Sequence, residues 1–170
     1  MCVCVQIVAY AQYRFAPGNC QTIEEQMHHL ETQIAIDAPA ERVWALLMDF
    51  PSYARWNPFV RSIEGDSKVG QPLKVFIQPP GVGGMRFSPT VLIVEPDREF
   101  RWKGKLLMPG LFDGEHYFKL EPQADGGIVF HQGELFSGIL VPLFRGSLNG
   151  ATKQGFVAMN EALKQAAEKE

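Results

Sequence analysis

The sequence predicts an α+β fold in which a curved antiparallel β-sheet wraps around one long C-terminal α-helix. Residues 147–170 repeat apolar side chains with a helical period and are rich in helix-forming residues. Residues 30–136 read mostly as short strands separated by turn residues. The apolar face of the helix must be buried against that sheet, so the space between them is either packed core or a ligand cavity.

Length and composition indicate one globular domain. The chain has 170 residues, of which 46% are hydrophobic and 21% charged, enough to fill a core. Its net charge of −3 gives no basic bias toward nucleic acid. No apolar run approaches the ~18 residues of a membrane span, so we expect no integral membrane segment.

The N-terminal residues do not match the rest of the chain. Residues 1–28 are predicted to be a poorly packed or non-native extension, and residues 29–170 the domain itself. No Lys or Arg precedes the apolar part, so a signal peptide is not indicated. The three cysteines, Cys2, Cys4 and Cys20, form neither a disulfide framework nor a zinc motif. We therefore expect a cytoplasmic protein with no metal and no cofactor.

Two short helices are predicted after the first strand. Residues 30–36 alternate as a strand does. Asp37 or Ala38 can cap the helix that follows, with Pro39 in its first turn. Pro51 ends that helix, and residues 53–58 read as a second helical turn.

Hairpins fill the middle of the chain. The turn residues Gly, Pro, Asp and Ser separate the apolar segments, and the connections are short enough for an antiparallel meander. Pro79 to Gly84 is long and rich in Gly and Pro, and is a candidate entrance loop. The predicted strands are residues 59–65, 73–78, 85–95, 99–107, 114–121 and 127–137.

Strand parity predicts which side chains face the helix. In the segment 114–121, His116, Phe118 and Leu120 form the more apolar face. A hairpin that pairs Leu120 with Phe130 also pairs Phe118 with Gln132 and His116 with Glu134. Gly104 on the preceding strand is expected to fall near His116 and leave room there. Ten residues are predicted to contact a ligand: Trp56, Val75, Trp102, Phe118, Phe130, Gln132, Leu148, Thr152, Phe156 and Met159.

His116, Gln132 and Glu134 are the polar members of this inward face. Three interpretations stay open: a satisfied polar network, a ligand-contacting set, or a catalytic His116–Glu134 pair acting as general acid and base. No nucleophile elbow, phosphate loop or metal triad is present in the sequence.

Several local motifs resemble those of the START-like or SRPBCC superfamily, whose fold is called a helix-grip. They are Asp37-Ala38-Pro39, Phe50-Pro51-Ser52-Tyr53, Trp56-Asn57-Pro58-Phe59, Pro109 to His116, Phe136 to Pro142 and Gly155 to Lys164. More narrowly, they look like the polyketide cyclase/dehydrase-like subgroup. The resemblance covers residues 30–168 and implies a cavity between sheet and helix. It says little about activity, because the superfamily includes cyclases, lipid carriers and receptors.

Three functions follow as expectations. The first is a soluble, cofactor-free protein that binds a hydrophobic small molecule, such as a lipid, polyketide or isoprenoid. The alternative is a cyclase or dehydratase that uses His116 and Glu134. The third is an interaction module whose cavity is filled by its own side chains. The oligomeric state is left open.

Overall fold

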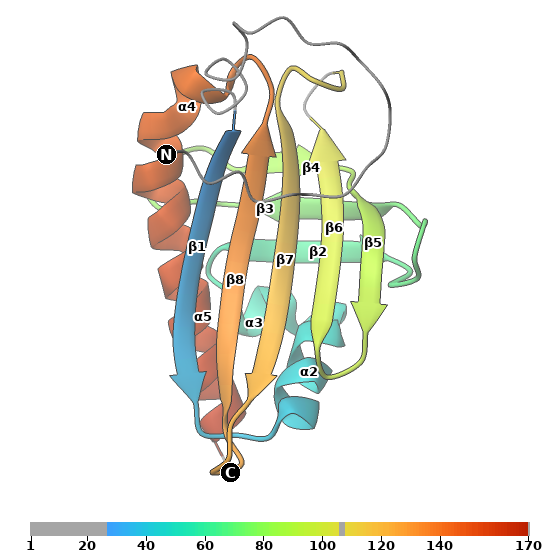
Figure 1. Cartoon of the computed structure of the whole chain (residues 1–170), viewed down its shortest axis with the longest axis vertical. Coiled ribbons are helices and arrows are strands. Elements are labelled where there is room, and N and C mark those ends of the chain that lie inside the picture. The colour runs from blue at the N-terminus through green and yellow to red at the C-terminus, as the bar shows by residue number, and fades with distance from the viewer. Residues whose placement is uncertain (1–26, 106–107, 170) are drawn as a thin grey trace, which may run out of the picture.

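The protein folds as two antiparallel sheets closed on one side by a long C-terminal helical segment. A computed structural model describes residues 27–105 and 108–169. The larger sheet has the strand order β1-β8-β7-β6-β5, and the smaller has the order β2-β3-β4. Figure 1 shows the smaller sheet behind the larger one with its strands running across it, and α5 along the β1 edge. The predicted α+β helix-grip fold is confirmed.

The larger sheet is a set of neighbouring antiparallel pairs. The β7–β8 hairpin has the predicted register, with Leu120 opposite Phe130, Phe118 opposite Gln132 and His116 opposite Glu134. The first strand, at the far edge, pairs with β8 along its whole length. The strand bounds are β1 Met27–Ile36, β5 Thr90–Glu95, β6 Glu99–Lys105, β7 Asp113–Pro122 and β8 Ile128–Ser137.

The smaller sheet corrects one predicted strand. Residues 85–95 were expected to form one strand, but the chain breaks at Ser88-Pro89 and gives β4 and β5 in different sheets. Proline has no backbone N–H for a ladder, and here its carbonyl accepts a hydrogen bond from Leu73 N (2.8 Å). A single bridge between Pro72 and Thr90 links the two sheets. The bounds are β2 Val60–Gly65, β3 Leu73–Ile77 and β4 Met85–Phe87.

Three short helical segments follow β1, as α2 Ala40–Met48, η1 Phe50–Ser52 and α3 Tyr53–Trp56. Pro39 is the N-cap residue of α2 rather than a member of its first turn. Its carbonyl accepts hydrogen bonds from Arg42 N and Val43 N. Neither Asp37 nor Ala38 is the cap, because Pro39 holds that position and no side chain caps the helix. The backbone N–H of Asp37 donates to Glu168 Oε1 at the end of α5 (2.7 Å).

The C-terminal helical segment begins earlier than the sequence periodicity indicates. It consists of α4 Val141–Ser147, a π-helical turn η2 Leu148–Thr152, and α5 Lys153–Glu168. Pro142 lies in the first turn of α4, where its missing N–H costs nothing. The π turn adds a residue to the helical repeat, which re-aims the side chains that follow.

Gly155 explains how α5 approaches the smaller sheet so closely. A Cβ at this position would lie 2.2 Å from the ring of Phe59. Phe59 in turn packs edge-on against Phe156, with ring centroids 5.4 Å apart. Gly155, a residue type that weakens a helix interior, is therefore required here for packing.

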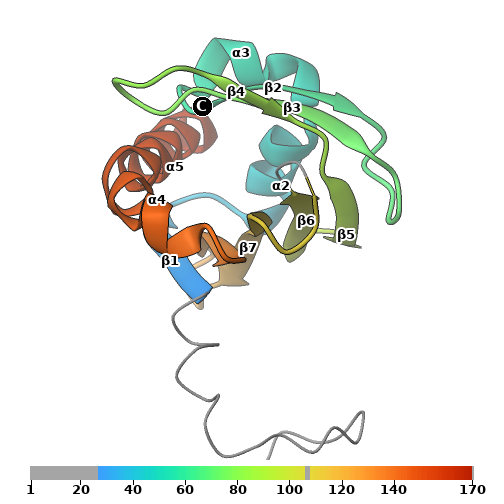
Figure 2. The same cartoon turned by 90° about the horizontal axis from the view of Figure 1, so that it is seen from above.

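The core residues pack between the sheets and α5, and Figure 2 shows from above how these elements are arranged. Phe118, Phe130, Phe156, Met159 and Leu163 are fully buried in this core. Their burial confirms the inward parity of β7 and β8 and the inward face of α5.

Gly104 was expected to lie near His116, but Trp102 takes this position. Gly104 pairs with Gly114, and Trp102 is the residue directly opposite His116. The ring of Trp102 fills the place where an open space was expected.

The first described residues belong to the larger sheet. β1 begins at Met27, so His28 and His29 belong to the sheet. The predicted extension, with the three cysteines, lies outside the described residues apart from Met27 and His28. In the ranges that are described, no helix has the length and apolar character needed to cross a membrane.

Candidate functional site: an apolar pocket with a His–Glu pair

A pocket of about 310 Å³ lies between the two sheets and the helical segment α4–η2. Its size is at the lower end of the range for small-molecule sites. The smaller sheet and its loop contribute Phe59, Val60, Ile77, Pro79, Val82, Gly83, Met85 and Phe87. The larger sheet and the helical segment contribute Trp102, Gly104, Lys105, Phe112, Gly114, His116, Glu134, Phe136, Phe144, Ser147, Leu148 and Thr152.

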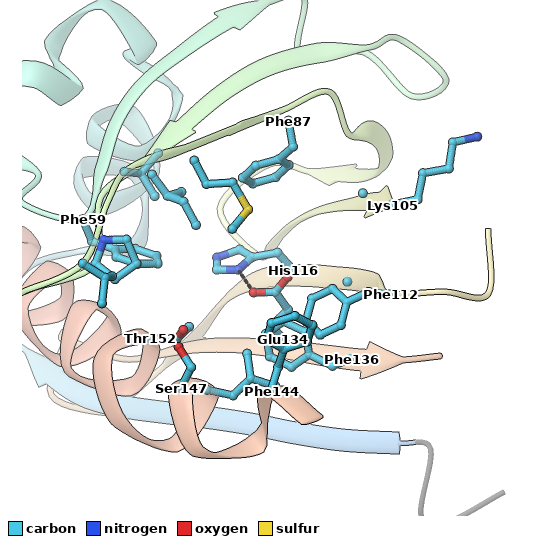
Figure 3. A pocket seen from close by; sticks show the side chains of 18 of the residues that line it. Phe59, Phe87, Lys105, Phe112, His116, Glu134, Phe136, Phe144, Ser147 and Thr152 are labelled. Carbon is cyan, nitrogen blue, oxygen red and sulfur yellow. Dashed lines mark hydrogen bonds and ion pairs between the residues drawn. The ribbon is translucent and has the colours of Figure 1, made fainter. Parts of the chain in front are cut away.

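Six of the twenty residues that line the pocket are Phe or Trp. In Figure 3, Phe87 lies on one side of the His116–Glu134 pair, and Phe112, Phe136 and Phe144 lie on the other. Phe112 is the centre of the second group, with ring centroids 5.5 Å from Phe136 and 5.4 Å from Phe144. This wall offers a ligand apolar surface and stacking partners.

His116 and Glu134 meet inside the pocket. His116 Nδ1 lies 3.4 Å from Glu134 Oε2, and the histidine is buried. On its other side, His116 Nε2 lies 3.5 Å from Gln132 Nε2. A carboxylate only accepts and an amide NH₂ only donates, so with the Gln132 amide in this orientation the tautomer that carries its proton on Nδ1 fits both neighbours.

Packing fixes the plane of the His116 ring. The ring stacks on Trp102 with centroids 4.7 Å apart and planes 13° from parallel. Phe118 and Phe156 meet it edge-on, at 4.8 and 5.2 Å. Three aromatic side chains from two strands and one helix therefore hold the imidazole, and only its Glu134 side faces the pocket.

The absence of a side chain at Gly114 gives the Glu134 carboxylate its space. A Cβ at Gly114 would lie 2.3 Å from Glu134 Oε1, closer than atoms can approach. The neighbouring residue on β6 is Gly104, which also lines the pocket. The Glu134 carboxylate occupies the space that a side chain at Gly114 would fill, and the Phe87 ring lies 3.3 Å from the place of a Cβ at Gly104.

The helical side of the pocket comes from the π turn. Leu148 and Thr152 are its first and last residues, and both line the pocket together with Ser147. Leu148 is buried, whereas Ser147 is exposed. Single π turns within helices are frequent at functional sites.

Exposed apolar side chains surround the mouth of the pocket. Val82, Met85 and Phe144 line it and are 46%, 49% and 39% exposed. Ile139 lies in an adjoining loop, where its backbone N–H donates a hydrogen bond to Gly110 O. Met108, Ile139 and Leu143 are also exposed. The loop 79–84, expected at the entrance, contributes Pro79, Val82 and Gly83 to the wall.

The structure brings together five of the predicted site residues on this wall. They are His116, Glu134, Trp102, Leu148 and Thr152. The other seven lie behind it: Val75, Phe118, Phe130, Gln132, Phe156 and Met159 are buried in the core, and Trp56 packs against it. Parity identifies the face of a strand but not the depth along it, so residues near the closed end were included. Gln132 does not line the pocket, but it contacts the pocket residue His116.

Several wall residues were not identified from the sequence. Phe136 and Gly114 have the inward parity and could have been found. Phe112 lies in the loop before β7, where no periodicity operates, and Phe144 lies in α4, which begins before the predicted start of the helix. Phe87 was hidden by the expectation of an unbroken strand through Pro89.

A second polar cluster lies on the outer face of the larger sheet. The Tyr117 hydroxyl donates a short hydrogen bond to Glu31 Oε2 and lies 2.9 Å from His29 Nε2. Burial, followed by the contacts with Glu31, raises the pKa of the Tyr117 phenol. In the described part of the chain, no group of three or more His, Cys, Asp and Glu side chains is arranged to hold a metal ion.

The fold and the pocket together define an α+β helix-grip protein with an apolar ligand-sized cavity. Residues 27–168 match the family described as polyketide cyclase / dehydrase and lipid transport. The chain belongs to this family, which confirms the predicted SRPBCC assignment. No curated protein sequence matches it.

Solved structures share this fold. The Zhui aromatase/cyclase from Streptomyces sp. R1128 superposes with a TM-score of 0.68 at 20% identity, covering 84% of this chain and 94% of that one. A START superfamily protein from Mycobacterium smegmatis gives a TM-score of 0.64 at 17% identity, covering 83% and 97%. The di-domain ARO/CYC BexL from the BE-7585A biosynthetic pathway gives 0.70 at 16% identity, covering 86% of this chain. The chain spans about half the length of that di-domain protein, 52%.

Proposed function

We propose that this protein binds a hydrophobic small molecule, of the lipid, polyketide or isoprenoid kind, between its sheets and its C-terminal helical segment. The observation that carries this proposal is the pocket of about 310 Å³, whose wall is mostly aromatic and aliphatic. Such composition with a few polar groups is usual for ligand sites. The exposed apolar rim gives an apolar ligand a route of entry.

Native mass spectrometry of the purified, untagged protein tests this proposal, followed by organic extraction of any bound molecule. We expect a co-purifying apolar compound of defined mass. A Gly104→Leu variant, checked for folding by circular dichroism, fills the pocket and should carry less of it. A bare wild-type protein that takes up no fatty acid, quinone or aromatic polyketide would contradict the proposal.

A second candidate function is cyclisation or dehydration of a polyketide. The specific observation in its favour is the His116–Glu134 pair within the pocket, 3.4 Å apart. A cyclisation needs a base to take a proton from carbon and an acid to return one, and such a pair can serve both. The similarity to proteins named aromatase/cyclase also supports it.

Turnover separates the two candidates. A poly-β-ketone thioester is incubated with the wild type and with Glu134→Gln, and products are followed by mass spectrometry. Loss of turnover in the variant, with unchanged binding of an apolar probe that has no hydroxyl, supports the enzyme. No turnover by the wild type leaves binding as the function.

The third function, an interaction module with a filled core, requires a protein without a ligand-sized pocket. The pocket of about 310 Å³ argues against it.

A further inference from the structure

We propose that the pocket selects neutral apolar molecules that carry a hydroxyl or phenol donor, and that Glu134 is the residue that excludes ligands with a buried carboxylate. This inference rests on the proposed binding function and specifies the ligand class. The inference rests on which polar side chains line the pocket, how deep they lie, and whether they donate or accept hydrogen bonds.

Two charged side chains line the pocket, and they lie at different depths. Lys105 is exposed and, in Figure 3, extends away from the His116–Glu134 pair. Glu134 has only 19% of its side chain exposed. The inner part of the pocket therefore holds an acidic group, and the basic group lies at the outside.

The neighbours of Glu134 leave one of its oxygens for a ligand. His116 engages Oε2, and within the described residues no other hydrogen bond to this carboxylate is present. Oε1 occupies the space that a Cβ at Gly114 would fill, and Glu134 lines the pocket. A carboxylate has about four acceptor positions, so Oε1 can accept from a ligand hydroxyl.

His116 cannot serve a ligand in the same way. Its Nδ1 faces Glu134 and its Nε2 faces Gln132, while Trp102 covers one face of the ring. Its effect is to orient the Glu134 carboxylate. His116 is thus a positioning residue, and Glu134 contacts the ligand.

This arrangement discriminates by charge. A hydroxyl that donates to a carboxylate forms a charge-assisted hydrogen bond, stronger than a neutral one. A ligand carboxylate at the same point brings two like charges together in a poorly solvated pocket, which is unfavourable. A free fatty acid with its head group inward is therefore a poor ligand, and a hydroxylated aromatic or a long-chain alcohol is a good one.

The test uses three matched probes: a naphthol, its methyl ether, and the corresponding naphthoate. Isothermal titration calorimetry with the full chain at neutral pH gives their affinities. We expect the naphthol to bind at least about tenfold more tightly than the naphthoate, with the ether in between because it has no donor.

Variants assign the discrimination to Glu134. Glu134→Gln removes the charge with little change in shape, and the gap between naphthol and naphthoate should narrow to within about threefold. Glu95→Gln removes a charge from an exposed position of β5 outside the pocket and should leave the ranking unchanged.

The outcomes separate this inference from the proposed function. If the wild type binds naphthoate as tightly as naphthol, the inference about Glu134 is wrong, whatever contact holds the naphthoate. Such a result would still support a ligand site. An unchanged gap in a folded Glu134→Gln also overturns it. Should that variant not fold, the wild-type ranking decides. Failure of all three probes to bind contradicts the binding function and this inference with it.

Discussion

The imidazole of His116 lies flat against the indole of Trp102, with ring centroids 4.7 Å apart and planes 13° from parallel. Trp102 is 2% exposed, and it also meets Phe100 and Phe118 edge-on. One side chain therefore joins the core to the pocket: its inner neighbours are packing partners, and its outer neighbour is the residue that orients Glu134.

Removing the Trp102 indole should destabilise the protein and also remove the ring on which His116 stacks. Trp102→Ala should lower the free energy of unfolding by about 3–5 kcal/mol, because a large buried aromatic leaves a cavity. Urea denaturation measures the change. Val157→Ala, at an exposed position of α5, should change it by less than about 0.5 kcal/mol. Equal effects for the two variants would mean that Trp102 is not part of the packed core.

Two helical glycines should respond in opposite ways to alanine. Gly155→Ala places a Cβ 2.2 Å from Phe59, and the resulting overlap should destabilise the protein by about 1–3 kcal/mol. Gly146→Ala in α4 meets nothing within 4 Å, so it should stabilise by up to about 1 kcal/mol through helix propensity. Thermal unfolding of the two variants gives the comparison. A stabilising Gly155→Ala would contradict the close approach of α5 to Phe59.

Asn57 should be needed for the turn that leads into β2. Its Oδ1 accepts hydrogen bonds from Phe59 N and Val60 N, both at 2.9 Å, and the side chain is fully buried. Asn57→Ala leaves two buried donors without a partner and should cost about 1–3 kcal/mol or more. Asn149→Ala, at an exposed position of η2, is the control. Loss of the same stability in both variants would contradict this role.

Tyr117 should make the protein less stable at high pH. Its pKa is raised in the folded state, by burial first and then by Glu31. This contribution is complete below the unfolded pKa of about 10 and is lost as the pH rises toward the folded value, at up to about 1.4 kcal/mol per pH unit. Urea denaturation from neutral pH to above pH ~10 should therefore give a shallower decline for Tyr117→Phe than for the wild type. Parallel declines would show that Tyr117 does not titrate with unfolding.

Most of the fold could be predicted from the sequence, because it depends on local signals. Alternation in β7 and β8 determined both parity and register, since a slip of one residue would turn His116 and Phe118 outward. The helical period identified α5. The break at Pro89 was missed although a proline within a strand pattern argues against one continuous strand. The π turn at Leu148–Thr152 was missed as well.

The candidate site could be predicted only in part. The pairing of His116 with Glu134 followed from the hairpin register. The position of the pocket along the sheet did not follow, because it depends on where α4 and the loop 79–84 approach the strands. For this reason the predicted ligand contacts Phe118 and Phe156 are buried in the core behind the pocket wall. The wall is formed instead by residues such as Phe112 and Phe144.

A methyl-labelled NMR titration with the naphthol probe shows directly whether a ligand binds between the sheets and the C-terminal helical segment. We expect saturable chemical-shift changes for methyl groups on the pocket wall, such as those of Ile77 and Leu148. The methyl signals of Val43 and Leu47, which belong to α2 and are buried in the core, should stay unchanged. Saturable shifts confined to residues away from the pocket, or no saturable shifts at all, would contradict a ligand site between the sheets and the C-terminal helical segment.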